Sequence, residues 1–131
     1  MIFCVAVNCM DGRVQLPVIE FLKKRFKADF VDNITEISAE QILAGETNRR
    51  QVQSIVDRID LSMARHKPVA IAVVACEQGA GDNSDKQKQI EHLDLSVKFL
   101  KRQYSAIEVI GLCIDKNWNV NEISFPEEFL G

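Results

Sequence analysis

An unbroken apolar run at residues 69–75 places the strongest constraint on how this chain folds. The run is too short for a typical helix, and a strand with one wet face would alternate apolar and polar residues. A continuous apolar strand instead fits the centre of a parallel sheet that is covered on both faces. A second apolar run, residues 2–7, predicts another buried strand.

Helical patterns alternate with these strands. Residues 14–26, 50–65 and 86–104 each repeat apolar side chains at intervals of three and four, as an amphipathic helix does. Shorter segments complete the order, namely strands at 28–31 and 107–113 and one or two helical turns at 38–43. The alternation predicts an α/β fold with three layers, α/β/α, built as a single domain over residues 1–131. Right-handed crossovers then give a four-stranded, mainly parallel sheet in the order 2-1-3-4. The tail is expected to be irregular, with residues 123–126 as a cap or edge and Trp118 packed in the last loop.

Charge and composition narrow the possible partners. The formal net charge is −3, and a nucleic-acid binder would need a basic stripe, so we expect no nucleic-acid partner. No apolar run approaches the ~20 residues that span a bilayer, so we expect no membrane partner. The N-terminus lacks the pattern of a signal peptide. Four cysteines without an export signal predict a cytoplasmic protein whose thiols stay reduced.

Reactive side chains follow both apolar strands at the points where they end. Cys9, Asp11 and Arg13 follow the first strand, and Cys76 follows the central one. These strands are neighbours in the predicted order, so both groups should line one crevice at the carboxyl ends, where open α/β sheets bind ligands. Asp11 and Arg13 are close enough in sequence to form a bidentate ion pair.

At these residues the chain resembles the β-class carbonic anhydrases. Cys9, Asp11 and Arg13 match the family motif C-x-D-x-R, and residues 109–115 resemble its last core strand and the aspartate after it. The likeness extends over about residues 2–123. It implies the carbonic anhydrase fold, a homodimer, and carbon dioxide or bicarbonate as the small-molecule partner.

The resemblance also implies a zinc site. In that family a cysteine, a histidine and a second cysteine bind zinc, and the metal-bound water attacks carbon dioxide. Here Cys76 stands at the histidine position and Gly79 at the second cysteine. Cys9 and Cys76 are therefore the expected metal ligands, with Asp11 and Arg13 as the catalytic orienting pair.

The departure from the motif predicts a degenerate zinc site. Asp11 could supply a third ligand, and Glu77 or a residue of a partner chain could supply another. A set of Cys9, Cys76 and Asp11 would carry three negative charges, which would weaken the Lewis acidity of zinc. If the protein is an enzyme, it would then be a weak zinc lyase that hydrates carbon dioxide or a related small electrophile.

Two other interpretations remain open on the same scaffold. Cys9 and Cys76 could act without metal as a thiol or redox pair, with Arg13 favouring a thiolate. Alternatively, the crevice could bind a small anion through Arg13 and backbone N–H groups of the loop after Cys76. The short Gly79-Ala80-Gly81 segment matches no nucleotide-binding fingerprint.

Overall fold

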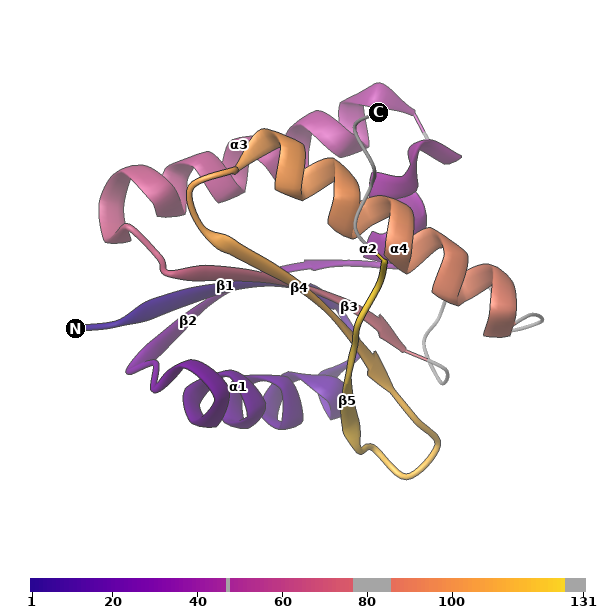
Figure 1. Cartoon of the computed structure of the whole chain (residues 1–131), viewed down its shortest axis with the longest axis horizontal. Helices are drawn as coiled ribbons and strands as arrows, with labels where there is room; N and C mark the ends of the chain where they lie inside the picture. Colours follow the sequence, from indigo (N-terminus) through magenta and orange to yellow (C-terminus); the bar gives the residue numbers. More distant parts are fainter. Residues whose placement is uncertain (47, 77–85, 127–131) are drawn as a thin grey trace.

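The computed structural model describes residues 1–46, 48–76 and 86–126, and these form one twisted sheet with helices on both faces (Figure 1). The strands lie in the order β2-β1-β3-β4-β5. The first four are parallel, and the fifth is antiparallel to its neighbour. The strands are β1 (Phe3–Cys9), β2 (Phe30–Glu36), β3 (Ala70–Cys76), β4 (Glu108–Ile114) and β5 (Val120–Ile123).

The predicted order of the first four strands is confirmed, and the strand count needs a correction. The tail was expected to be irregular, but Val120–Ile123 forms β5 and pairs with β4. The polar segment between β4 and β5 forms a tight reverse turn, so β5 needs no apolar run of its own to be held in place. The salt bridges of Arg25 with Glu108, at 3.0 Å, and with Glu122, at 2.9 Å, tie β4 and β5 to the end of α1 (Gly12–Phe26).

Strand β2 is longer and begins later than the sequence pattern predicts. It covers Phe30–Glu36 rather than residues 28–31, and all seven of its residues are in register with β1. It is an edge strand, so one side needs no strand partner and its faces carry polar residues such as Asp32 and Asn33. A pattern based on apolar runs misses such a strand.

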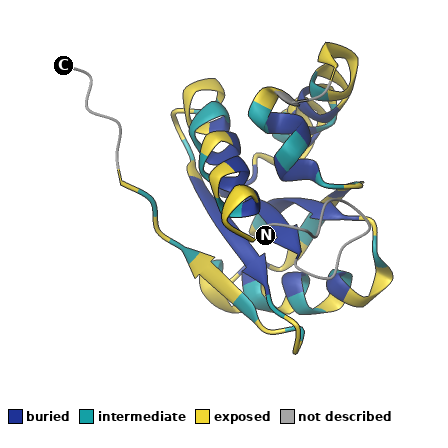
Figure 2. Ribbon diagram, turned by 90° about the vertical axis from the view of Figure 1, so that its right-hand side faces the viewer, coloured by how far each residue is buried: buried dark blue, intermediate teal, exposed yellow. Residues whose placement is uncertain are grey.

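Helices cover the two faces unequally. Helix α1 packs alone on one face through Val14, Val18 and Leu22, while the other helices cover the opposite face (Figure 1). These are α2 (Ala39–Gln41), the π-helical η1 (Ile42–Glu46), α3 (Arg49–His66) and α4 (Lys86–Gln103). Strand β3 is buried along its whole length, as expected for the central strand (Figure 2).

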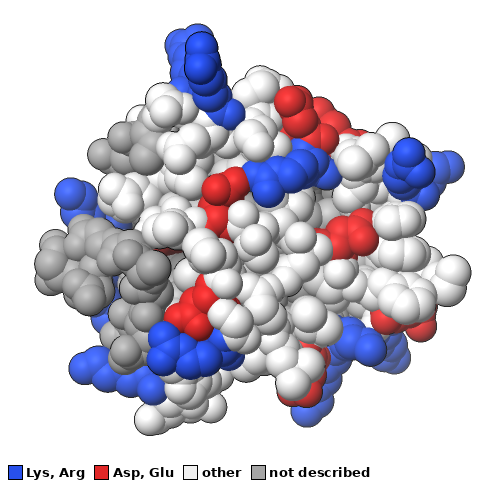
Figure 3. Space-filling model, turned by 180° about the vertical axis from the view of Figure 1, so that it is seen from behind, with Lys and Arg blue, Asp and Glu red and all other residues white. Residues whose placement is uncertain are grey.

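One face of the molecule carries both signs of charge in close mixture (Figure 3). On the face shown in Figure 3, Lys and Arg side chains lie among Asp and Glu side chains and do not gather into a stripe. Among the described residues, no helix is both long and apolar enough to cross a membrane.

Candidate functional site

Two buried thiols meet at the carboxyl ends of the neighbouring strands β1 and β3. Cys9 is the last residue of β1 and is 4% exposed, and Cys76 is the last residue of β3 and is 6% exposed. Together with Ser38, Glu40 and Val74 they line one cavity of about 10 Å³. A space of this size holds about one water molecule, so the two thiols face a very small common volume.

Asp11 and Arg13 form an ion pair at the start of α1, beside the thiols. The Arg13 Nη2 atom lies 2.7 Å from Asp11 Oδ2, and its Nε atom lies 3.0 Å from Oδ1. Asp11 also caps the helix, because its Oδ1 accepts a hydrogen bond from the backbone N–H of Arg13 at 3.0 Å. These bonds lower the pKa of Asp11 to about 2. The carboxylate is therefore ionised at neutral pH, and both of its oxygens are occupied.

The electrostatics connect this ion pair with the second thiol. The hydrogen bonds that Arg13 donates to Asp11 are the main cause that raises the pKa of Arg13, and a charge on Cys76 contributes further. Arg13 is thus near enough to Cys76 to stabilise a thiolate there. The structure brings the four residues that the sequence analysis singled out to one edge of the sheet.

Polar groups hold the end of β1 in place around Cys9. The Asn8 Oδ1 atom accepts a hydrogen bond from the Cys9 N–H at 2.8 Å, while the Gln15 side chain donates to the Cys9 carbonyl. Asn8 is fully buried, and its Nδ2 atom has no hydrogen-bond partner within the described part of the chain. An unpaired buried donor of this kind is costly unless a further group accepts from it.

Glu40 is a site residue that the sequence analysis missed. The residue lines the thiol cavity and is 4% exposed, and burial raises its pKa to about 7 against the opposing hydrogen bonds from its own backbone N–H and from Gln89. Gln89 also donates to the Cys76 carbonyl at 2.9 Å. The Ser38–Gln41 segment resembles a capping box, in which the Ser38 hydroxyl would bond to the backbone N–H of Gln41. Ser38 instead has φ 53° and makes no capping bond, and this conformation accompanies a Glu40 that is turned inward.

Trp118 is the second residue that was missed, because sequence alone predicts only that it packs in the last loop. Its ring lies 4.7 Å from the Arg13 guanidinium carbon. The indole is partly buried against the same cluster that contains Cys9 and Cys76. Only the pairing of β5 with β4, which the sequence pattern did not predict, brings Trp118 to this edge.

The described residues offer donor atoms of the types that zinc binds, but too few of them. Two thiols and one carboxyl line the same cavity, and zinc accepts all three groups as ligands. Within residues 1–46, 48–76 and 86–126, however, no three His, Cys, Asp or Glu side chains form a group that could hold a metal ion. A catalytic zinc ion takes three protein ligands, so the described set is incomplete. Glu77 and Gly79 lie outside the described residues.

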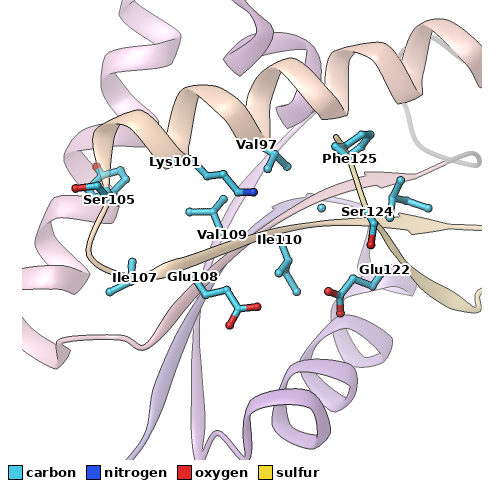
Figure 4. Close-up of a pocket in the computed structure, with 13 residues that line it drawn as sticks. Val97, Lys101, Ser105, Ile107, Glu108, Val109, Ile110, Glu122, Ser124 and Phe125 are labelled. Atoms are coloured by element: carbon cyan, nitrogen blue, oxygen red, sulfur yellow. The ribbon is translucent and has the colours of Figure 1, made fainter. Parts of the chain in front are cut away.

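A larger hollow lies away from the thiols, between α4 and the β4–β5 pair. Its volume is about 420 Å³, and Val97, Lys101, Glu108 and Phe125 are among the residues that line it (Figure 4). No thiol lines this hollow, and its charged side chains include both acidic and basic ones. We therefore assign the chemistry to the thiol edge.

Comparisons with known proteins identify the family and the fold of the chain. The model of a family described as putative carbonic anhydrase matches residues 1–124. No curated protein sequence matches the chain. The fold is similar to that of a tetrameric β-carbonic anhydrase from the filamentous ascomycete Sordaria macrospora, with 12% identity and a TM-score of 0.63 over 93% of this chain and 80% of that one. It is also similar to the β-carbonic anhydrase of the fungal pathogen Aspergillus fumigatus, with 10% identity and a TM-score of 0.56 over 95% of this chain and 76% of that one.

Proposed function

Because the chain belongs to the putative carbonic anhydrase family, we propose that it is a carbonic-anhydrase-like protein with a degenerate zinc site. Its small-molecule partner is carbon dioxide or bicarbonate, or a related small electrophile. One observation carries the proposal: Cys9 and Cys76 line one cavity beside the Asp11–Arg13 ion pair. Cys9 and Cys76 are the donors for any zinc that the protein holds, and Asp11 with Arg13 orients the small molecule.

The roles follow from the chemistry of each group. A bound zinc ion supplies Lewis acidity to this kind of site. Two thiolates with a third anionic ligand would reduce that acidity, so hydration is expected to be slow compared with the family site, in which the third ligand is a neutral histidine. Asp11 stays ionised and accepts hydrogen bonds, while Arg13 fixes the direction in which the carboxylate points.

Zinc content and carbon dioxide hydration test the proposal together. Protein purified without chelator is expected to retain zinc or to regain it on addition, and to hydrate carbon dioxide slowly. Cys9→Ser and Cys76→Ser should each lose the metal, whereas Cys4→Ser, in the interior of β1, should keep it. A wild-type protein that takes up no zinc and shows no hydration above the buffer rate would overturn the proposal.

A metal-free thiol pair is the second candidate, and the shared cavity favours it too. Oxidation of Cys9 and Cys76 to one disulfide would release two protons and pass two electrons to an added oxidant such as oxidised glutathione. The reaction should give one disulfide in wild type and none in either serine variant. Anion binding has less support, because the Arg13 Nε and Nη2 atoms are already bonded to Asp11.

We also propose that the protein is a cytoplasmic homodimer. None of the four cysteines, all of which lie within the described residues, forms a disulfide, as is usual in a reducing compartment. Met10 and Ile37, which follow the paired strands β1 and β2, are 56% and 49% exposed, and apolar side chains left open beside a site often mark an interface. Light scattering on the purified protein tests this, and a monomer at micromolar concentration would contradict it.

A further inference from the structure

The turn between β4 and β5 presents an aromatic ring to the ion pair of the site. The Arg13 guanidinium carbon lies 4.7 Å from the centre of the Trp118 ring. The same guanidinium donates hydrogen bonds to Asp11, from Nη2 at 2.7 Å and from Nε at 3.0 Å. We propose that Trp118 is a positioning residue, which keeps Arg13 on Asp11 from a segment about a hundred residues away in sequence. The inference rests on the proposed function only in that this function needs the oriented Asp11 carboxylate.

The turn is built so that Trp118 has one conformation. Asp115 Oδ1 accepts hydrogen bonds from the backbone N–H groups of Asn117, at 2.9 Å, and Asn119, at 3.0 Å. The Trp118 N–H donates to the Asp115 carbonyl at 3.0 Å. Trp118 itself has φ 63°, in the left-handed region that bulky residues rarely adopt. Such a conformation persists where surrounding groups hold it, and here the hydrogen bonds that Asp115 accepts hold the turn.

Arg13 needs this second contact because its ion pair lies near solvent. The Arg13 side chain is 66% exposed, and the Asp11 side chain is 16% exposed. An exposed ion pair is weak on its own, since water screens the charges and the long arginine side chain loses freedom. The indole face attracts a guanidinium and limits the directions in which it can leave. Removal of the ring should therefore leave Asp11 without its bidentate partner for a larger fraction of the time.

Hydrogen exchange at Arg13 Hε tests the inference without any metal or substrate. The sample is the full-length protein, labelled with ¹⁵N, in a buffer that contains a metal chelator. In Trp118→Leu the exchange rate should rise about two- to five-fold, which is a cation–π contact of about 0.5–1 kcal/mol converted at 1.36 kcal/mol per tenfold. Trp118→Phe should restore part of the protection, and Lys116→Ala, an exposed change in the same turn, should have no effect. An unchanged rate in a folded Trp118→Leu protein would overturn the inference.

A second measurement decides the matter if Trp118→Leu does not fold. Trp118 is the only tryptophan of the chain, so its fluorescence reports the contact directly. Arg13→Met removes the cation and should change the emission intensity, while Lys116→Ala should not. Identical spectra for wild type and Arg13→Met would count against the contact in solution. Neither measurement uses zinc or carbon dioxide. The contact between Trp118 and Arg13 can therefore be tested even if the proposed function fails, and the proposed function can be tested even if the contact is absent.

Discussion

The side chain of Gln89 on α4 hydrogen-bonds the buried carboxyl of Glu40 at the thiol cavity. One polar side chain thus joins helix α4 to α2 and β3, two of the segments that line the cavity, because Gln89 also donates to the Cys76 carbonyl. The hydrogen bonds from Gln89 and from the Glu40 backbone N–H do not replace the hydration that a charged carboxylate loses on burial. The protonation state of Glu40 is therefore linked to folding.

We predict that stability decreases with rising pH because of Glu40. Its pKa is about 7 in the folded protein against the ordinary value of 4.5, so between these two pH values the folded state binds a proton that the unfolded state has lost. The stabilisation that protonated Glu40 contributes is complete below about pH 4.5 and is lost as the pH rises through 7. The difference of about 2.5 pKa units corresponds to about 3 kcal/mol. Urea unfolding at pH 5 and pH 8, with chelator present, measures it.

Glu40→Gln is expected to remove most of this pH dependence and to stabilise the protein at pH 8. Glu91→Gln changes an exposed carboxyl on α4 and serves as the control, which should keep the wild-type slope. Equal slopes for wild type and Glu40→Gln would show that Glu40 does not carry the effect.

Gly111→Ala is predicted to destabilise the fold by about 1–2 kcal/mol through overpacking. A Cβ atom at this position in β4 would lie 3.1 Å from Val97 Cγ2 and 3.2 Å from Leu93 Cγ. Both neighbours are buried on α4 and have little room to move. Thermal or urea unfolding checks the loss. The matched change Gly12→Ala, where no atom lies within 4 Å of the new Cβ, should cost much less.

The same position allows a coupling test. Val97→Ala removes the methyl group that the new Cβ would meet, so the Gly111→Ala/Val97→Ala double variant should lose less stability than the sum of the single variants. Strict additivity would mean that the contact with Val97 is not the source of the strain.

The sequence was most informative where apolar patterns are strong. The central strand β3 and the three long helices are predicted correctly because burial on two faces, or on one stripe, requires a continuous or periodic apolar pattern. β2 and β5 are edge strands held by pairing with a neighbour, so their sequences carry little such signal. Their boundaries depend on tertiary contacts that no local pattern records.

The residues of the candidate site also differ in whether the sequence could predict them. Cys9, Asp11, Arg13 and Cys76 could be placed together because they follow strands whose order the alternation predicts. Glu40 and Trp118 could not, since one depends on the inward turn at Ser38 and the other on the pairing of β5. Both join the site through segments distant in the chain.

The hydrogen bonds that Asp115 accepts are predicted to make the β4–β5 turn sensitive to acid. Backbone N–H donors, chiefly that of Asn119, lower the pKa of Asp115 below its usual range. The stabilisation is therefore complete above about pH 4, the unfolded value, and is lost as the pH falls through the lower folded value. The melting temperature of Asp115→Ala should lie below that of wild type at pH 7, and the gap should shrink below pH 4. Asp115→Asn keeps the accepting Oδ1 atom and should recover part of the gap at pH 7. A gap that stays constant down to pH 2 would contradict the role of the charged carboxylate.

Thiol labelling should separate the two cavity cysteines from Cys4 in the core. Cys4 is fully buried in β1, and burial raises the pKa of its thiol to about 11 from 9.0. Because only the thiolate reacts, this shift alone slows alkylation of Cys4 at pH 8 about 100-fold relative to the unfolded chain. Iodoacetamide labelling followed by peptide mass spectrometry, with protein in urea as the reference, measures the ratio for each cysteine. If Cys4 is labelled in the folded protein as fast as Cys9 and Cys76, labelling reports unfolding rather than the site. If Cys4 stays protected while Cys9 and Cys76 react, the reactive thiols are those of the cavity, and zinc added beforehand should protect them only if they are its donors.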